Sequence, residues 1–171
     1  MPRAGASRLR RRAALVDHLE VGDAQTVHLE LFDDEALDDG PADRQAADRH
    51  RSDRCGAKGE RGDFNTIVNA PLSAGDGGNA FREAFETVIL PRLRAFKPDI
   101  MIISAGFDAH TRDPLANLNL VEADFSWATK KLMEIADTSA KGRVVSLLEG
   151  GYDLQGLSRS VAAHVTALMQ G

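Results

Sequence analysis

Apolar side chains recur at regular intervals mainly in the second part of the chain. Between residues 79 and 96 they lie three or four positions apart, which predicts a helix with one apolar face. Pro91 falls inside this stripe, and we expect a kink there because proline has no amide hydrogen and its ring crowds the preceding turn. The stripe consists of Phe81, Phe85, Val88, Ile89, Leu93 and Phe96.

Two further runs are apolar at successive positions, which is typical of strands buried on both faces of a parallel sheet. They span residues 97–104 and 143–150, and a shorter β-branched run at 64–72 stops near Pro71. Helical spacing returns over residues 122–137 and again from Leu157 to Leu168. Strands and helices therefore alternate, with connections long enough for parallel pairing, and the predicted class is α/β with a mostly parallel sheet.

The first part of the chain has a different composition. Residues 38–61 contain no Val, Ile, Leu, Met, Phe, Tyr or Trp, so we expect them to stay loose. Residues 26–32 alternate weakly and fit a short strand or, if their acids are ignored, a helix. We therefore expect residues 1–63 to be largely irregular, whether disordered or read from a shifted frame, and residues 64–171 to form the folded part.

Composition and charge exclude several classes of protein. The chain has 171 residues and a net charge of -5, so it lacks the basic excess of a nucleic-acid-binding protein. Its single cysteine, Cys55, has no partner for an intrachain disulfide and fits a reducing cytoplasm. Apolar runs stay below the eighteen or so residues that a membrane span needs, so we expect no membrane segment.

The loops that follow the two apolar strands carry the candidate chemistry, because ligands of α/β sheets bind outside the carboxyl ends of the strands. Asp108 follows Gly106 and either offers a carboxylate to a cation or caps its own turn. Tyr152 follows Gly150 and Gly151 and is either a hydroxyl donor to an oxyanion, with the glycines leaving the path of a substrate open, or a packed rim aromatic.

Other polar residues near these loops have simpler interpretations. His110 fits a hydrogen-bonding loop residue as well as a ligand, and Asp113 before Pro114 is typical of a turn. His164 on the last helix is expected at the surface or satisfied in the core.

Three stretches together resemble the C-terminal half of the histone deacetylase family, on the side of bacterial acetoin-utilisation and acetylpolyamine amidohydrolase-like proteins. They are "NTIVNAPLSAGDG", "PDIMIISAGFDAHTRDPLANLNL" and "RVVSLLEGGYDLQGLSRSV". The resemblance implies an arginase-like three-layer α/β fold, a catalytic Zn²⁺, and hydrolysis of an N-acetyl amide such as acetyl-lysine or an acetylated polyamine. It makes Asp108 a zinc ligand and Tyr152 the donor to the polarised carbonyl, and it places Leu115 in the lining of the acyl tunnel.

The chain departs from this family pattern upstream. It lacks the Asp-x-His zinc-ligand pair that runs into His-Gly-Asn-Gly and the adjacent histidines used as general acid and base, and His18 and His28 stand ten residues apart. We therefore expect a zinc-dependent deacetylase by descent, incomplete and impaired in zinc binding; the alternative is a non-catalytic remnant or binding module of the same fold. An unrelated α/β hydrolase or phosphatase would need a GxSxG or phosphate loop, and neither is in the sequence. A sheet lacking its upstream neighbours would expose an apolar edge and self-associate.

Overall fold

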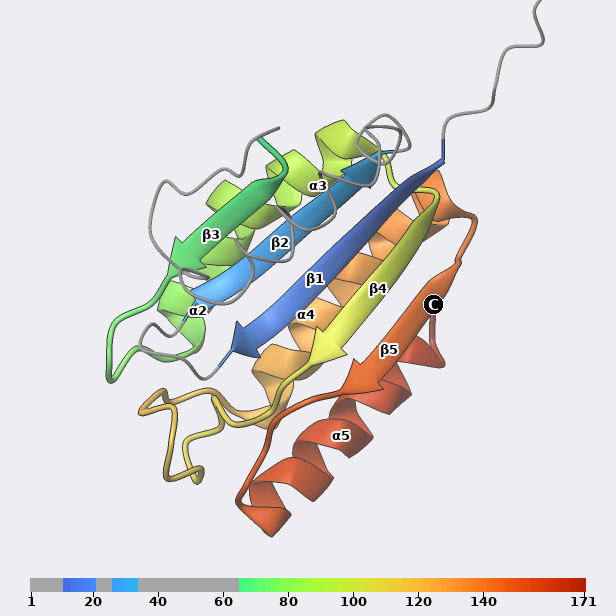
Figure 1. Cartoon of the computed structure of the whole chain (residues 1–171). Helices are drawn as coiled ribbons and strands as arrows, with labels where there is room; N and C mark the ends of the chain where they lie inside the picture. Colours follow the sequence, from blue (N-terminus) through green and yellow to red (C-terminus); the bar gives the residue numbers. More distant parts are fainter. Residues whose placement is uncertain (1–10, 21–25, 34–64) are drawn as a thin grey trace, which may run out of the picture.

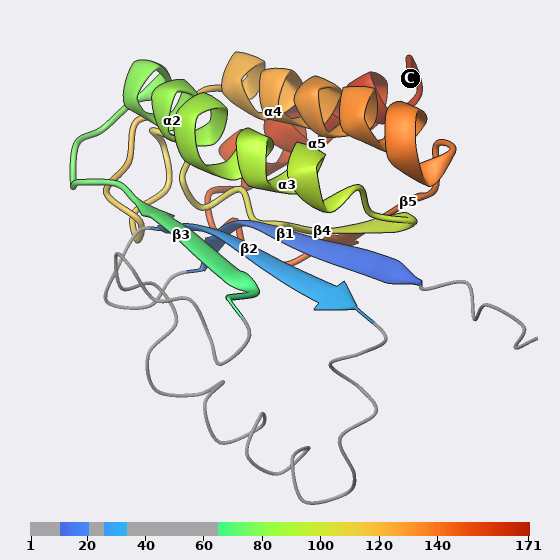
Figure 2. The same ribbon diagram turned by 90° about the horizontal axis from the view of Figure 1, so that it is seen from above.

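A five-stranded sheet with its helices on one face makes up residues 11–20, 26–33 and 65–171, which the computed structural model describes (Figures 1 and 2). The parallel pairs are β1 with β4 and β4 with β5, whereas β2 is antiparallel to both β1 and β3. Only β2 therefore opposes the direction of the other strands in the described sheet. The strand order is β3 (Ile67–Pro71), β2 (Thr26–Asp33), β1 (Arg12–Glu20), β4 (Ile100–Ala105) and β5 (Val144–Leu148).

The predicted helix over residues 79–96 is present, but a π-helical turn interrupts it. Helix α2 (Gly78–Ala84) leads into this turn (Phe85–Ile89), and α3 (Leu90–Phe96) follows. The amide of Leu90 donates to the carbonyl of Phe85, five residues earlier, and Pro91 then stands in the first turn of α3. Proline is tolerated in that first turn, so the irregularity expected at Pro91 takes the form of a π turn just before it.

The other two predicted helices are confirmed. Helix α4 (Glu122–Ile135) continues into a second π-helical turn (Ala136–Ala140), and α5 (Leu154–Leu168) closes the chain. Figure 2 shows the helices together on one side of the sheet. They bury the side chains that the strands direct toward them, so the described residues supply two of the three layers that the resemblance implies. Buried strand residues on this side include Ala14, Val16, Leu29, Met101 and Ile103.

The prediction that residues 143–150 form a strand buried on both faces is wrong. Strand β5 is the last strand of the described sheet, and its Val145, Leu147 and Leu148 are 44%, 51% and 62% exposed. The apolar run reflects one neighbour, β4, and one helical layer, rather than burial on all sides. On β4 the helix side is buried while Ile100 and Ile102, on the opposite side, are only half-buried.

Two strands of the sheet come from before residue 64. The strand alternative for residues 26–32 is confirmed as β2, while β1 was not predicted because its apolar alternation is short and interrupted by acids. The expected looseness of residues 38–61 and the environment of Cys55 lie outside the described residues, and the domain boundary at 64 stays a prediction. Among the described helices, none combines the length and the apolar character that a membrane crossing requires.

Candidate active site at the carboxyl edge of the sheet

Three loops meet at one edge of the sheet because β3, β4 and β5 run in the same direction. The loop after β3 is joined to the loop after β4 by two backbone hydrogen bonds, from Gly75 to Asn117 (2.7 Å) and from Asn119 to Asp76 (2.8 Å). The loop after β4 is joined to the turn after β5 by the amide of Phe107, which donates to the carbonyl of Gly150 at 2.9 Å. The edge is therefore one connected surface.

The long polar loop after β4 is held in a defined conformation. The amide of Thr111 donates to the carbonyl of Leu120 at 2.9 Å, and the amide of Leu120 donates to the carbonyl of Ala109 at 3.1 Å. Leu118 and Leu120 are buried beneath it. Two apolar anchors and a backbone ladder thus order a loop whose surface is polar.

Asp108 lies at the start of this loop and is buried, with 2% of its surface exposed. Its carboxylate packs against the backbone of Gly150: a Cβ atom built on that glycine would be 2.9 Å from Oδ2 of Asp108. A side chain at residue 150 would therefore displace the carboxylate. The absence of a side chain at Gly150 lets Asp108 contact the turn after β5. The loop after β4 and the turn after β5 therefore lie together at this edge of the sheet, which we call the rim.

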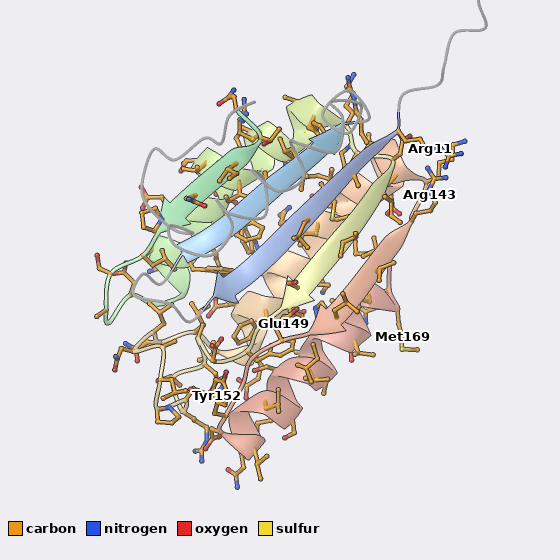
Figure 3. All side chains as sticks on the ribbon, in the orientation of Figure 1. Arg11, Arg143, Glu149, Tyr152 and Met169 are labelled. Atoms are coloured by element: carbon orange, nitrogen blue, oxygen red, sulfur yellow. The ribbon has the colours of Figure 1, made fainter. Side chains whose placement is uncertain are left out.

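Tyr152 stands two residues further along that turn and is 58% exposed. Figure 3 shows it beyond the carboxyl ends of β4 and β5, whereas Arg143 lies at the opposite end of β5. Gly151 precedes it with a φ of 135°, a backbone conformation that favours glycine. The turn therefore presents the only tyrosine of the chain to solvent at the rim that Asp108 occupies.

Asp113 has a larger part in this site than the sequence indicates. Its Oδ2 accepts hydrogen bonds from the amides of Tyr152 (2.6 Å) and Asp153 (3.2 Å), and its Oδ1 accepts from the amide of Leu115 (3.1 Å). The predicted turn chemistry is present in the Leu115 contact, but the contacts to the β5 turn were missed. The available signal was an acid before a proline, which gives no indication of a partner about forty residues away.

His110 supports the loop from inside. It is 3% exposed, its Nδ1 accepts from the amide of Arg112 at 3.2 Å, and its Nε2 lies 3.7 Å from a carboxylate oxygen of Glu122. Its ring stacks on Phe125 with an interplanar angle of 15°. Of the two interpretations left open, this geometry fits the loop hydrogen-bonder.

His164 is a satisfied core residue, as one of its two predicted interpretations states. Its Nδ1 lies 2.7 Å from the hydroxyl of Thr129 on α4, and its Nε2 lies 2.8 Å from the hydroxyl of Ser146 on β5. Burial of the ring lowers the pKa of His164 from its ordinary value of 6.5, because the charged form loses hydration. The histidine therefore joins α4, α5 and β5 in its neutral form.

We expect the free energy of unfolding to decrease as the pH falls below the ordinary histidine pKa of 6.5. Below pH 6.5 the unfolded chain takes up a proton on His164, while the folded chain, with its lower pKa, does not. The contribution of His164 to stability is therefore complete above pH 6.5 and is lost as the pH falls toward the folded pKa. Urea unfolding at a series of pH values measures this slope. His164→Gln should reduce the slope, and an unchanged slope in that variant would assign the dependence to other groups.

The described donors do not fit a zinc site. Within residues 11–20, 26–33 and 65–171, no group of three His, Cys, Asp or Glu side chains is close enough to hold a metal ion. Catalytic zinc ordinarily takes about three protein ligands. Asp108 alone does not meet that requirement, so the donor set in the described part of the chain disagrees with the Zn²⁺ that the resemblance implies.

Comparisons with known proteins agree with the resemblance. The family profile described as "Histone deacetylase domain" matches residues 48–168. Histone deacetylase 14, chloroplastic, of Arabidopsis thaliana is 46% identical over 104 residues, covering 61% of this chain and 25% of that protein. An uncharacterized protein of Synechocystis sp. is 44% identical over 114 residues, covering 67% of this chain and 36% of that protein.

Solved structures give the same answer for the fold. The HDA15 HD domain superposes with a TM-score of 0.53 and 38% identity, over 57% of this chain and 27% of that chain. The histone deacetylase Clr3 has the same TM-score with 36% identity, over 57% of this chain and 16% of that one. The chain thus spans about a third or less of these proteins, and the α/β fold and the family resemblance are confirmed over that part. This chain belongs to the histone deacetylase family.

Proposed function

We propose that this chain carries the aspartate and tyrosine half of a deacetylase active site acting on N-acetyl amides, such as acetyl-lysine or acetylated polyamines. The observation that supports it is the contact of Asp108 with Gly150, which joins the loop after β4 to the turn that presents Tyr152. Family membership supports the reaction class.

Each rim residue has a proposed role in binding the substrate. The hydroxyl of Tyr152 donates a hydrogen bond to the acetyl carbonyl oxygen and stabilises the negative charge that develops there. Gly150 and Gly151 keep side chains out of the substrate's path, and Leu115, which is 50% exposed, lines the channel for the acyl chain. Asp108 offers its carboxylate as one metal ligand.

We propose further that zinc binding is impaired. Asp108 is the predicted ligand within the described residues, and the side chains of His18 and His28 lie outside them. A single carboxylate competes poorly with water for Zn²⁺, which would polarise the carbonyl and acidify a bound water in a complete site. We therefore expect weak metal binding and low turnover.

A fluorogenic acetyl-lysine substrate, assayed with and without a chelator, tests this function together with metal analysis of the purified protein. We expect slow turnover that the chelator abolishes and Tyr152→Phe reduces. Substrate binding without turnover would favour the non-catalytic binding module. One tightly bound Zn²⁺ per chain would contradict the proposed impairment, and unchanged turnover in Tyr152→Phe would place the carbonyl donor elsewhere.

We also propose that the chain self-associates through the open edge of β5. The amide of Met101 bonds the carbonyl of Arg143, and the amide of Glu149 bonds the carbonyl of Ala105, so these β5 residues face β4. Residues between them at alternate positions, such as Ser146, direct their backbone groups to the open edge. If two copies pair antiparallel about Ser146, Arg143 of one copy lies opposite Glu149 of the other. These two residues lie at opposite ends of β5 (Figure 3).

Leu147→Lys should weaken this association, because a charge on an exposed edge strand opposes strand addition. Sedimentation velocity over a range of protein concentrations measures it. Leu154→Lys is the matched control, since Leu154 is an 80% exposed leucine on α5 rather than on the edge. A monomer at all concentrations, or equal effects of the two lysines, would contradict the proposal.

The cytoplasm remains the proposed compartment, on the basis of the single cysteine, and direct nucleic-acid binding is not proposed for a chain of net charge -5. Two plant relatives are named chloroplastic, which is a statement about those proteins. Fractionation of the source cells distinguishes the compartments: recovery in an organelle would overturn the proposal.

A further inference from the structure

The turn that carries Tyr152 has little side-chain packing of its own. Two glycines precede the tyrosine, and the tyrosine is more than half exposed. Glycine has the largest conformational freedom of any residue, so the backbone of such a turn needs an external constraint to adopt one position. The contacts of Asp113 supply that constraint.

Asp113 is 9% exposed, and its carboxylate binds two loops at once. Two consecutive amides, of Tyr152 and Asp153, converge on its Oδ2, which is how successive backbone N–H groups form an anion-binding concavity. Its other oxygen holds the amide of Leu115 in the loop after β4. A hydrogen bond to a charged acceptor is roughly twice as strong as one between neutral groups. The same side chain therefore fixes Tyr152 and Leu115 through their backbones.

Arg112, the residue before Asp113, makes a second contact between the β4 loop and the β5 turn. Nε of Arg112 lies 3.0 Å from Oδ1 of Asp153, which also accepts from the amide of Gly156 at 2.7 Å as the N-cap of α5. The β5 turn is thus attached to the β4 loop on one side and to α5 on the other. Asp113 is the buried member of this set.

We propose that Asp113 is a positioning residue, which holds the turn bearing Tyr152 and the loop bearing Leu115 in a fixed relation at the rim occupied by Asp108. Its relevance to catalysis rests on the proposed deacetylase function, but the positioning itself is independent of turnover. Asp113 makes no proposed contact with a substrate and acts through the backbone of the residues that do.

Amide hydrogen exchange in the full chain, comparing Asp113→Asn with the unsubstituted protein, tests the positioning. The asparagine keeps the size of the side chain but replaces one acceptor with a donor, so one of the two loops loses its partner. We expect amide exchange at Tyr152 and Asp153, or at Leu115, to be faster by about tenfold or more, because this is the effect typical of losing a hydrogen bond to a charged group.

Asp124→Asn is the matched control. Asp124 is also buried, and it accepts one backbone hydrogen bond, from Val121, and two side-chain hydrogen bonds from Arg82. Its partners differ from those of Asp113, which are the amides of the β5 turn and of Leu115. Faster exchange at the rim in Asp113→Asn alone supports the proposal. Equal exchange at the rim in both variants, or no change in Asp113→Asn, would overturn it.

A measurement on the unsubstituted chain covers the case in which Asp113→Asn does not fold. A through-hydrogen-bond scalar coupling between the amide nitrogen of Tyr152 and the carboxylate carbon of Asp113 reports the contact directly, and its absence at neutral pH would overturn the proposal. Where turnover is detectable, Asp113→Asn should lower kcat with a smaller change in KM, and Asp124→Asn should not. Failure of the deacetylase assay removes the proposed function but leaves the exchange result to decide the positioning.

Discussion

Replacing Phe125 with alanine should lower the free energy of unfolding by about 3–5 kcal/mol, the range for removing a buried aromatic ring. Phe125 is 1% exposed, and its ring meets the edge of Phe107 with centroids 5.2 Å apart. It also stacks beneath His110 at 6.5 Å. One side chain of α4 therefore supports both ends of the Phe107–His110 segment, which contains Asp108. Removing this ring should loosen the loop at the rim as well as lower the stability of the core.

Phe81→Ala provides the control for this effect. Phe81 is fully buried too, but its ring contacts are with Phe85 and Trp127, whereas the ring of Phe125 contacts Phe107 and His110. Both variants should unfold at lower urea concentration, followed by the fluorescence of the single tryptophan. Only Phe125→Ala should accelerate amide exchange at Asp108 and His110, and Phe125→Leu should show a milder form of the same change. Equal exchange at the loop in both alanine variants would mean that Phe125 has no special part in supporting it.

The helices and the shared rim could be predicted because their signals are local. The stripe from Phe81 to Phe96 sets a helix by its spacing alone, and the apolar run before Asp108 sets a strand followed by a loop. Parallel pairing of β4 with β5 then follows from the helix between them, and it brings the Asp108 loop and the Tyr152 turn to one edge. Two of the three stretches that carry the family resemblance contain the Asp108 loop and the Tyr152 turn.

The features that could not be predicted depend on contacts between distant residues. The addition of β1 beside β4 pairs Leu15 with Ile102, and no short-range pattern specifies a partner almost ninety positions away. The exposure of β5 was missed because an apolar run looks the same whether it has one neighbouring strand or two. The hydrogen bond from the amide of Tyr152 to Asp113 was missed because an aspartate that forms a turn and an aspartate that also joins two loops look the same in the sequence.

Gly151→Ala should destabilise the chain more than the same change at Gly75. Both glycines have positive φ, 135° at Gly151 and 91° at Gly75, so each alanine should cost about 1–3 kcal/mol in backbone strain. A Cβ at Gly75 meets nothing within 4 Å, whereas a Cβ at Gly151 would lie 2.8 Å from Cδ1 of Leu157 and 3.4 Å from Cβ of Phe107. Crowding should add about 1–3 kcal/mol at Gly151 only.

Combining Gly151→Ala with Leu157→Ala separates strain from crowding. If crowding against Leu157 causes the excess destabilisation of Gly151→Ala, the losses of unfolding free energy in the two single variants should not add in the double variant. The double variant should be more stable than their sum predicts, by most of the difference between Gly151→Ala and Gly75→Ala. Urea unfolding of the variants measures this coupling. An additive result would assign the excess to the backbone of the turn, and the position of Tyr152 would then depend on the conformation of Gly151 rather than on the packing of α5 beneath it.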